Sequence, residues 1–318
     1  VRVARMSIRV IRFRNFSSAC SATGGRVADR VRGKAATCFS CHVFKIDKGI
    51  FAVGTFSSTT DLVTKELTSM GLTVINQQLG WVTTEGSLRD AYKVMLWSRV
   101  GDRVVWIIKR GDAGQLDKFR GLVREIHWQS YLYISSKIRI DVSGKVNWLK
   151  NSRFAGQILM DAIRDQAELA NQPRPEYESH NPDIRIALRF SRGRVDVGLY
   201  LNKTPLNQRG YRKYGGRAPL KETLAQVMIQ RLQIADSKKF IIVDPFCGVG
   251  TLLIEAIMCI NQIAPQRSRP VEQLCSWRGL EIVSWDKLVG EARKYEKDTG
   301  VQCIGCLLYT SDAADDRV

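Results

Sequence analysis

The chain has 318 residues, of which 44% are hydrophobic and 25% charged, and its formal net charge is +18. This length allows about two domains of 100 to 200 residues, and the composition is that of an ordinary globular chain, which excludes a wholly disordered protein. The sequence contains no uninterrupted apolar stretch of about 18 residues, which excludes an integral membrane protein.

The first 46 residues are strongly basic. They contain ten Lys or Arg and one acid, Asp29, and so carry +9 of the +18. Their Arg- and Ser-rich composition is typical of a mitochondrial or plastid transit peptide, with Met6 as a plausible start. A disordered basic tail that touches RNA is the alternative. We therefore expect an organellar matrix protein, or a cytoplasmic one if this segment is not a targeting signal.

The eight cysteines are too sparse for a disulfide framework, so a reducing compartment is the default. Cys38, Cys41 and His42 fit a haem-attachment pattern, which we interpret as chance because the basic leader offers no surrounding helical core. A four-thiolate zinc site with Cys303 and Cys306 is not expected either. The sequence therefore predicts no metal site.

The region 50–108 predicts a β-α-β-β-α-β unit. Apolar or β-branched runs indicate strands, and periodic apolar residues indicate helices; the strands are 50–53, 72–75, 81–83 and 104–108, and the helices 60–70 and 87–97. Gly71 ends the first helix and Ser87 caps the second. This order of elements is that of a ferredoxin-like fold.

A second α/β segment follows. Its predicted helices are 114–126 and 152–169, and its predicted strands are 131–140, 183–190 and 194–201. The strand 183–190 alternates apolar and charged residues, which predicts a sheet with one wet face. The arginines of this region would line either an RNA-facing surface or a merely solvated one: Arg185, Arg189, Arg192 and Arg194.

Residues 203–221 contain six basic residues and no acid, interleaved with Tyr211 and Tyr214. Basic side chains that bind phosphates, next to tyrosine rings on which bases can stack, are what binding of single-stranded RNA requires. A solvated basic loop explains the same composition equally well.

The most informative stretch is 240–256, FIIVDPFCGVGTLLIEA. A β-branched run ends in Asp-Pro, passes through a glycine turn and enters a helix, which is the nucleotide-binding edge of a doubly wound sheet. Gly248 and Gly250 let a ligand approach the main chain, and Thr251 places a hydroxyl near the helix N-terminus. We interpret Glu255 as a charge that favours the start of this helix.

The sequence also narrows the ligand of this loop. No Gly-Lys-Ser/Thr follows, which excludes a P-loop, and Leu253 occupies the third glycine position of a dinucleotide fingerprint. A nucleoside ligand without a pyrophosphate remains, and S-adenosylmethionine fits that description. An ordinary strand-turn-helix is the alternative. Cys247 has no local base and is interpreted as a packing residue.

Two blocks carry a family resemblance. DPFCGVGTLLIEA at 244–256, preceded by RGYR at 209–212 and APLKETLA at 218–225, resembles the bacterial-type large-subunit rRNA guanine-N2 methyltransferases that carry a THUMP domain. Shorter matches upstream extend the resemblance over about residues 50–305: FA at 51–52, MLWSR at 95–99, NSRF at 151–154, PRP at 173–175 and NPDIR at 181–185.

The resemblance implies an α/β and α+β architecture: a ferredoxin-like domain plus a THUMP domain, followed by the first part of a class I (Rossmann-like) methyltransferase domain. The implied boundaries are a transit-peptide-like leader at 1–46, the ferredoxin-like domain at 47–110, the THUMP RNA-binding domain at 111–202 (or from near 90), the N-terminal part of the S-adenosylmethionine-dependent methyltransferase domain at 203–305, and a non-native tail at 306–318.

The resemblance also implies site residues. Those that would contact S-adenosyl-L-methionine are Asp244, Phe246, Gly248, Gly250, Thr251 and Thr223. The resemblance places Arg209, Tyr211 and Arg212 where the THUMP module meets the catalytic domain. We expect RNA contacts at Arg209, Tyr211, Arg212, Lys213, Arg217 and Arg153.

The sequence departs from the family pattern near residue 305. The family's acidic residue for the cofactor ribose and its Asn-Pro-Pro-aromatic segment for the flipped guanine are missing, and CLLYTSDAADDRV at 306–318 resembles a translated sequencing adapter. We therefore expect an RNA guanine-N2 methyltransferase fragment with no catalytic residue in this chain, inactive by itself. Its expected partner is RNA, either rRNA or tRNA, and not a membrane. A non-catalytic RNA-binding or ribosome-assembly factor is the alternative, and Leu253 disfavours a nicotinamide oxidoreductase.

Overall fold

The computed structural model describes residues 48–133, 136–212, 219–232, 241–275, 277–278 and 284–305. The predicted leader at 1–46 and tail at 306–318 lie outside the described residues. In the residues that the structure describes, every helix is too short or too polar to traverse a bilayer.

The first unit has the β-α-β-β-α-β order that the sequence predicts. Its elements are β1 (Gly49–Gly54), α1 (Thr60–Ser69), β2 (Thr73–Gln78), β3 (Trp81–Gly86), α2 (Leu88–Trp97) and β4 (Arg103–Asp112). The strands pair antiparallel in the order β2-β3-β1-β4, which is the ferredoxin-like arrangement. Ser87 begins α2 with a capping box, because its hydroxyl accepts a hydrogen bond from the Asp90 amide while the Asp90 carboxylate accepts one from the Ser87 amide.

The second segment extends the same sheet. It contains α3 (Leu116–Arg124), β5 (Lys137–Gly144), α4 (Ser152–Leu169), β6 (Glu176–Tyr177), β7 (Ile184–Ser191) and β8 (Arg194–Tyr200). Because β8 pairs with β4, one eight-stranded sheet runs in the order β2-β3-β1-β4-β8-β7-β5-β6. The strand predicted at 131–140 begins only at Lys137, and residues 128–130 form a 3-10 turn.

The predicted wet face of the strand at 183–190 is wrong. Every residue of β7 from Ile184 to Phe190 is buried. The Arg185 guanidinium pairs with Asp141 and lies 4.6 Å from the centroid of the Tyr200 ring. Arg189 lies over the ring of Trp81. Both arginines are therefore buried and make their contacts inside the protein. The RNA-facing interpretation of these two residues is wrong as well.

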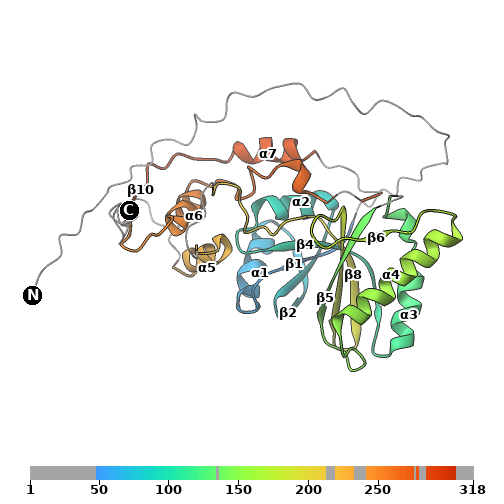
Figure 1. Cartoon of the computed structure of the whole chain (residues 1–318). Helices are drawn as coiled ribbons and strands as arrows, with labels where there is room; N and C mark the ends of the chain where they lie inside the picture. Colours follow the sequence, from blue (N-terminus) through green and yellow to red (C-terminus); the bar gives the residue numbers. More distant parts are fainter. Residues whose placement is uncertain are drawn as a thin grey trace, which may run out of the picture.

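The C-terminal part packs against the first unit. It contains α5 (Glu222–Leu232), β9 (Ile241–Asp244), α6 (Thr251–Ile260), α7 (Trp285–Arg293) and β10 (Gln302–Gly305). β9 and β10 pair in parallel, with Asp244 beside Gly305. α5 lies next to α1, where Arg231 pairs with Asp61, and packs on α6 (Figure 1). α7 lies along α2, where the rings of Tyr92 and Trp285 have their centroids 6.4 Å apart (Figure 1). The loop between β9 and α6 follows Asp244, at the carboxyl end of β9.

Candidate functional site

The loop between β9 and α6 has the tight shape that its glycines predict. The Phe246 amide donates to Asp244 Oδ1 at 3.0 Å, and the Gly250 amide donates to the Cys247 carbonyl at 2.8 Å. Gly248 and Gly250 have φ of 51° and 77°, in the left-handed region that favours glycine. The loop therefore closes on its own main chain and delivers the chain into α6.

The loop is also open to a ligand. Among the described residues, a Cβ on Gly248 would meet no heavy atom within 4 Å, and one on Gly250 would meet Ile254 Cδ1 alone, at 4.0 Å. Phe246 is 73% exposed. Gly250 is the N-cap of α6, and because glycine has no side chain it cannot accept hydrogen bonds from the first main-chain amides of the helix. Together these features make an accessible helix N-terminus with partial positive charge.

The two threonines of the predicted cofactor set are buried. Thr251, the first residue of α6, is 2% exposed, and its Oγ1 accepts a hydrogen bond from Arg212 at 2.9 Å. Thr223 is 1% exposed in the first turn of α5, which packs on α6. The structure thus brings Asp244, Phe246, both glycines and Thr251 into one loop and places Thr223 on the neighbouring helix.

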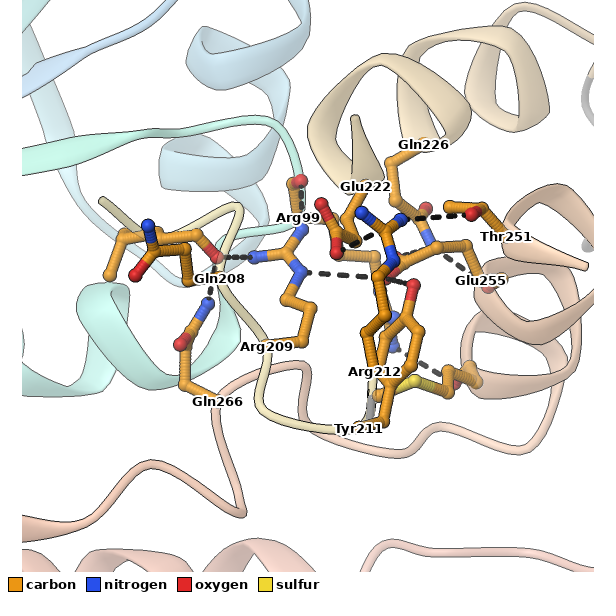
Figure 2. A network of polar contacts seen from close by, with 12 residues as sticks. Arg99, Gln208, Arg209, Tyr211, Arg212, Glu222, Gln226, Thr251, Glu255 and Gln266 are labelled. Atoms are coloured by element: carbon orange, nitrogen blue, oxygen red, sulfur yellow. Dashed lines mark hydrogen bonds and ion pairs between the residues drawn. The ribbon is translucent and has the colours of Figure 1, made fainter. Parts of the chain in front are cut away.

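Arg209 is not available to RNA. Its side chain is 0% exposed, and its two terminal nitrogens donate to the main-chain carbonyls of Leu206 and Arg99 (Figure 2). Its Nε lies 3.5 Å from Glu255 Oε1. The expectation of a direct RNA contact is therefore wrong for this residue, because every nitrogen of the guanidinium faces the interior.

Tyr211 and Arg212 also point at α6 rather than outward (Figure 2). The Tyr211 hydroxyl donates to Glu255 Oε1 at 3.0 Å, and burial, reinforced by the Glu255 charge, raises the pKa of Tyr211 well above its usual range. Arg212 Nη2 donates to the Leu220 carbonyl and lies 3.2 Å from Glu222 Oε1, besides its bond to Thr251. These polar groups hold the start of α6.

The remaining predicted RNA contacts are Arg153, Lys213 and Arg217. Lys213 and Arg217 lie outside the described residues. Arg153 is exposed in the first turn of α4, where its amide donates to Asn151 Oδ1 at 2.9 Å. The part of the chain that the structure describes holds no group of three His, Cys, Asp or Glu side chains placed to bind a metal ion.

Glu255 has a central place in these contacts that its sequence position alone did not predict. This residue is 0% exposed, and Nε2 of the Gln226 side chain donates both to the main-chain carbonyl of Glu255 at 2.7 Å and to Glu255 Oε2 at 2.8 Å. A lone acid within the apolar run LLIEAI was the available signal, because a glutamate is almost never fully buried unless it is paired. The interpretation as a charge that favours the helix start overlooked those partners.

Two family descriptions match separate parts of the chain. Residues 209–311 match an RMKL-like methyltransferase domain, and residues 52–105 match an RlmL ferredoxin-like domain. The second match coincides with the strands β1 to β3 and the start of β4, and the first includes the glycine loop and its polar supports.

Relatives named ribosomal RNA large subunit methyltransferase K/L match most of the chain. The protein of Alteromonas mediterranea is 35% identical over 223 residues, which is 70% of this chain and 32% of that protein. The protein of Chromohalobacter salexigens is 35% identical over 256 residues, which is 79% of this chain and 35% of that protein. The chain thus spans about a third of the length of these relatives.

The organellar localisation is corrected by these matches. The relatives are bacterial, including that of Pseudomonas aeruginosa at 34% identity over 73% of this chain and 32% of that protein. The prediction of a mitochondrial or plastid protein is therefore wrong. Its basis was composition alone, and an Arg- and Ser-rich stretch does not separate a transit peptide from any other basic segment.

Solved structures share the fold. A predicted N6-adenine-specific DNA methylase from Listeria monocytogenes superposes with a TM-score of 0.70 at 23% identity, covering 82% of this chain and 68% of that one. A structure titled "SMU.472, a putative methyltransferase complexed with SAH" gives 0.66 at 23% identity, covering 80% of this chain and 67% of that one. The chain therefore has a ferredoxin-like unit followed by a class I methyltransferase fold.

Proposed function

We propose that this chain, which carries an RlmL ferredoxin-like domain and an RMKL-like methyltransferase domain, is the RNA-docking and cofactor-binding portion of an rRNA guanine-N2 methyltransferase that uses S-adenosylmethionine. The names of the relatives support the class of reaction and the RNA substrate. The guanine N2 position rests on the resemblance of the residues 209–225 and 244–256 alone.

The observation that carries the proposal is the open glycine loop. Gly248 and Gly250 have left-handed backbone conformations, and no atom of the residues that the structure describes comes closer than 4.0 Å to their Cβ positions, which leaves room for a nucleoside against the main chain. Asp244, Phe246, Gly248, Gly250 and Thr251 would hold it, with Thr223 behind them. When bound, S-adenosylmethionine supplies an activated methyl group, and a related structure with a bound SAH supports this choice.

We assign the RNA contacts to the second unit and the basic connection that follows it. Arg153 is exposed at the start of α4, and Lys213 and Arg217 belong to the same proposal. We keep the boundaries 47–110, 111–202 and 203–305 for a ferredoxin-like, a THUMP and a methyltransferase portion, although β4 crosses residue 110 and joins the first two into one sheet.

No catalytic residue is assigned among the described residues, because the sequence contains no Asn-Pro-Pro-aromatic segment to hold a flipped guanine. We therefore propose that this chain binds the cofactor and RNA but transfers no methyl group by itself.

Calorimetry with S-adenosylhomocysteine and with NAD tests the cofactor. We expect heat of binding from the first ligand only, and loss of that heat in Gly250→Val, whose side chain would enter the ligand space. Binding of NAD alone would overturn the proposal. Retained RNA binding without any S-adenosylhomocysteine binding would favour the non-catalytic RNA-binding factor instead.

Transfer of label from S-adenosylmethionine to rRNA by this chain tests the second statement. We expect no transfer to rRNA or to tRNA, and methylation of either by this chain alone would contradict it.

A further inference from the structure

Helix α6, which begins at the glycine loop, is held at three levels by residues from outside it. Its first residue, Thr251, accepts a hydrogen bond from Arg212. Glu255, in its second turn, forms an ion pair with Arg209 and accepts hydrogen bonds from the side chains of Tyr211 and Gln226. At its other end, Arg99 Nη2 donates to the carbonyls of Met258 at 3.2 Å and Ile263 at 2.9 Å. The helix is thus fixed along its whole length by polar contacts.

The contact at the C-terminal end of α6 comes from the ferredoxin-like unit. Arg99 follows α2, and its amide donates to Glu66 Oε1 at 3.1 Å in α1. Glu66 Oε1 also accepts from the Val100 amide at 3.2 Å and from Gln230 Nε2 of α5 at 2.9 Å. The turn that carries Arg99 therefore has its position set by α1, and the same carboxylate anchors α5.

The middle level is a buried ion pair. The terminal nitrogens of Arg209 donate to the carbonyls of Leu206 and Arg99, and its Nε lies 3.5 Å from Glu255 Oε1. Both side chains are 0% exposed. Taking one partner away leaves an uncompensated charge in the interior, which is strongly unfavourable.

The two upper levels are only three residues apart in the connecting segment. Arg209 and Tyr211 meet Glu255, and Arg212 meets Thr251 (Figure 2). Arg99, whose carbonyl accepts a hydrogen bond from Arg209, is therefore linked by contacts to the helix that follows the glycine loop. The contact path runs from Glu66 through Arg99 and the Arg209–Glu255 pair to the start of α6.

We propose that Glu255 is a positioning residue. Through its pair with Arg209, it couples the packing of the ferredoxin-like unit against α6 to the conformation of the glycine loop. The inference rests on the proposed function only in that this loop is taken to be the cofactor loop. Glu255 touches no ligand in this proposal; it fixes the angle and register at which α6 leaves Gly250.

Amide hydrogen exchange of the ligand-free chain tests this proposal. In Glu255→Gln we expect exchange at residues 247–254 to accelerate by about tenfold or more, with α4 unchanged. The matched control is Arg231→Gln, which removes the exposed ion pair between Arg231 in α5 and Asp61 in α1 without touching α6. The control should exchange as the unchanged chain does.

A purely structural role predicts a different pattern. If Glu255→Gln accelerates exchange equally in α5, α6 and α7, or leaves residues 247–254 unchanged, the proposal is overturned. If this variant does not fold, Arg212→Gln serves instead, because it leaves the Arg209–Glu255 pair intact while it removes the contacts of Arg212 with Thr251, the Leu220 carbonyl and Glu222. Faster exchange is then expected at the start of α6 and at the start of α5, where Glu222 lies, and no change at the start of α6 would overturn the proposal.

The exchange measurement needs no ligand, so it is independent of the proposed function. Titration of the unchanged chain with S-adenosylhomocysteine tests that function separately. If the unchanged chain binds, Glu255→Gln should weaken binding about tenfold or more and Arg231→Gln should not; equal affinity in all three would contradict the coupling.

Discussion

The guanidinium of Arg189 in β7 lies 4.1 Å from the centroid of the Trp81 ring in β3, although β1, β4 and β8 lie between their strands. Neighbouring strands are about 4.8 Å apart, so β3 and β7 would be about 19 Å apart in a flat sheet. The two side chains meet because the sheet curls. This contact joins the ferredoxin-like unit to the segment that follows it.

The contact of Trp81 with Arg189 predicts a measurable coupling. Burial lowers the pKa of Arg189 to about 10, yet the group is charged at neutral pH and can interact with the ring face. A double-mutant cycle of Trp81→Leu and Arg189→Met, followed by urea unfolding, should give a coupling free energy of about 1 to 2 kcal/mol. Strictly additive losses would show that the ring and the cation merely lie near each other.

This contact also shows where sequence reasoning fails for the fold. The strands and helices of the first unit, the helix at 152–169 and the strand-loop-helix at 240–256 follow from local periodicity, because each pattern repeats within a few residues. The burial of β7 does not. Its charged residues look like a wet face until Trp81 and Asp141, from strands far away in the sequence, cover them.

The candidate site divides in the same way. The glycine loop is local, and the sequence predicts its shape. The burial of Arg209 is not local, because Arg209 donates to the carbonyl of Arg99, 110 residues earlier, and forms an ion pair with Glu255 in a later helix. A basic, tyrosine-containing segment has the same composition whether it binds RNA or supports a helix, so composition alone misassigned this residue.

Substituting one glycine of the loop and one glycine of a helix separates the effect of backbone strain from the effect of steric fit. Gly250→Ala should destabilise the chain by about 1 to 2 kcal/mol, because φ of 77° is strained for alanine even though there is space for its Cβ. Gly121→Ala, in the exposed middle of α3 with no atom near the added Cβ, should instead stabilise by about 0.5 to 1 kcal/mol. Urea unfolding measures both. Equal effects of the two substitutions would show that the left-handed loop conformation is not retained in solution.

Glu222 predicts a pH dependence of stability. Burial raises the pKa of its carboxyl above the ordinary value of 4.5, and Arg212 opposes this only in part. A raised folded-state pKa means that the neutral form is favoured in the fold, so its stabilising contribution is complete below about 4.5 and is lost as pH rises through the folded pKa.

The Glu222→Gln variant isolates that contribution. The free energy of unfolding of the unchanged chain, minus that of the variant, should fall as pH rises from 4.5 through the folded pKa. Urea unfolding over a pH series gives both values. A difference that rises over this window would mean that Arg212 outweighs the cost of burial.

Arg153 tests whether α4 contacts RNA or whether the net charge of +18 alone attracts it. Arg153→Ala should weaken binding of an rRNA fragment several-fold at low salt and reduce the salt-dependence slope by about one, because one phosphate contact is lost. Arg89→Ala removes the same charge from α2, where Arg89 is paired with Glu291 at 2.7 Å, and should leave the slope unchanged. Fluorescence anisotropy at several salt concentrations measures both. Equal weakening by the two substitutions would mean that RNA responds to the overall field of the chain and that α4 provides no specific contact.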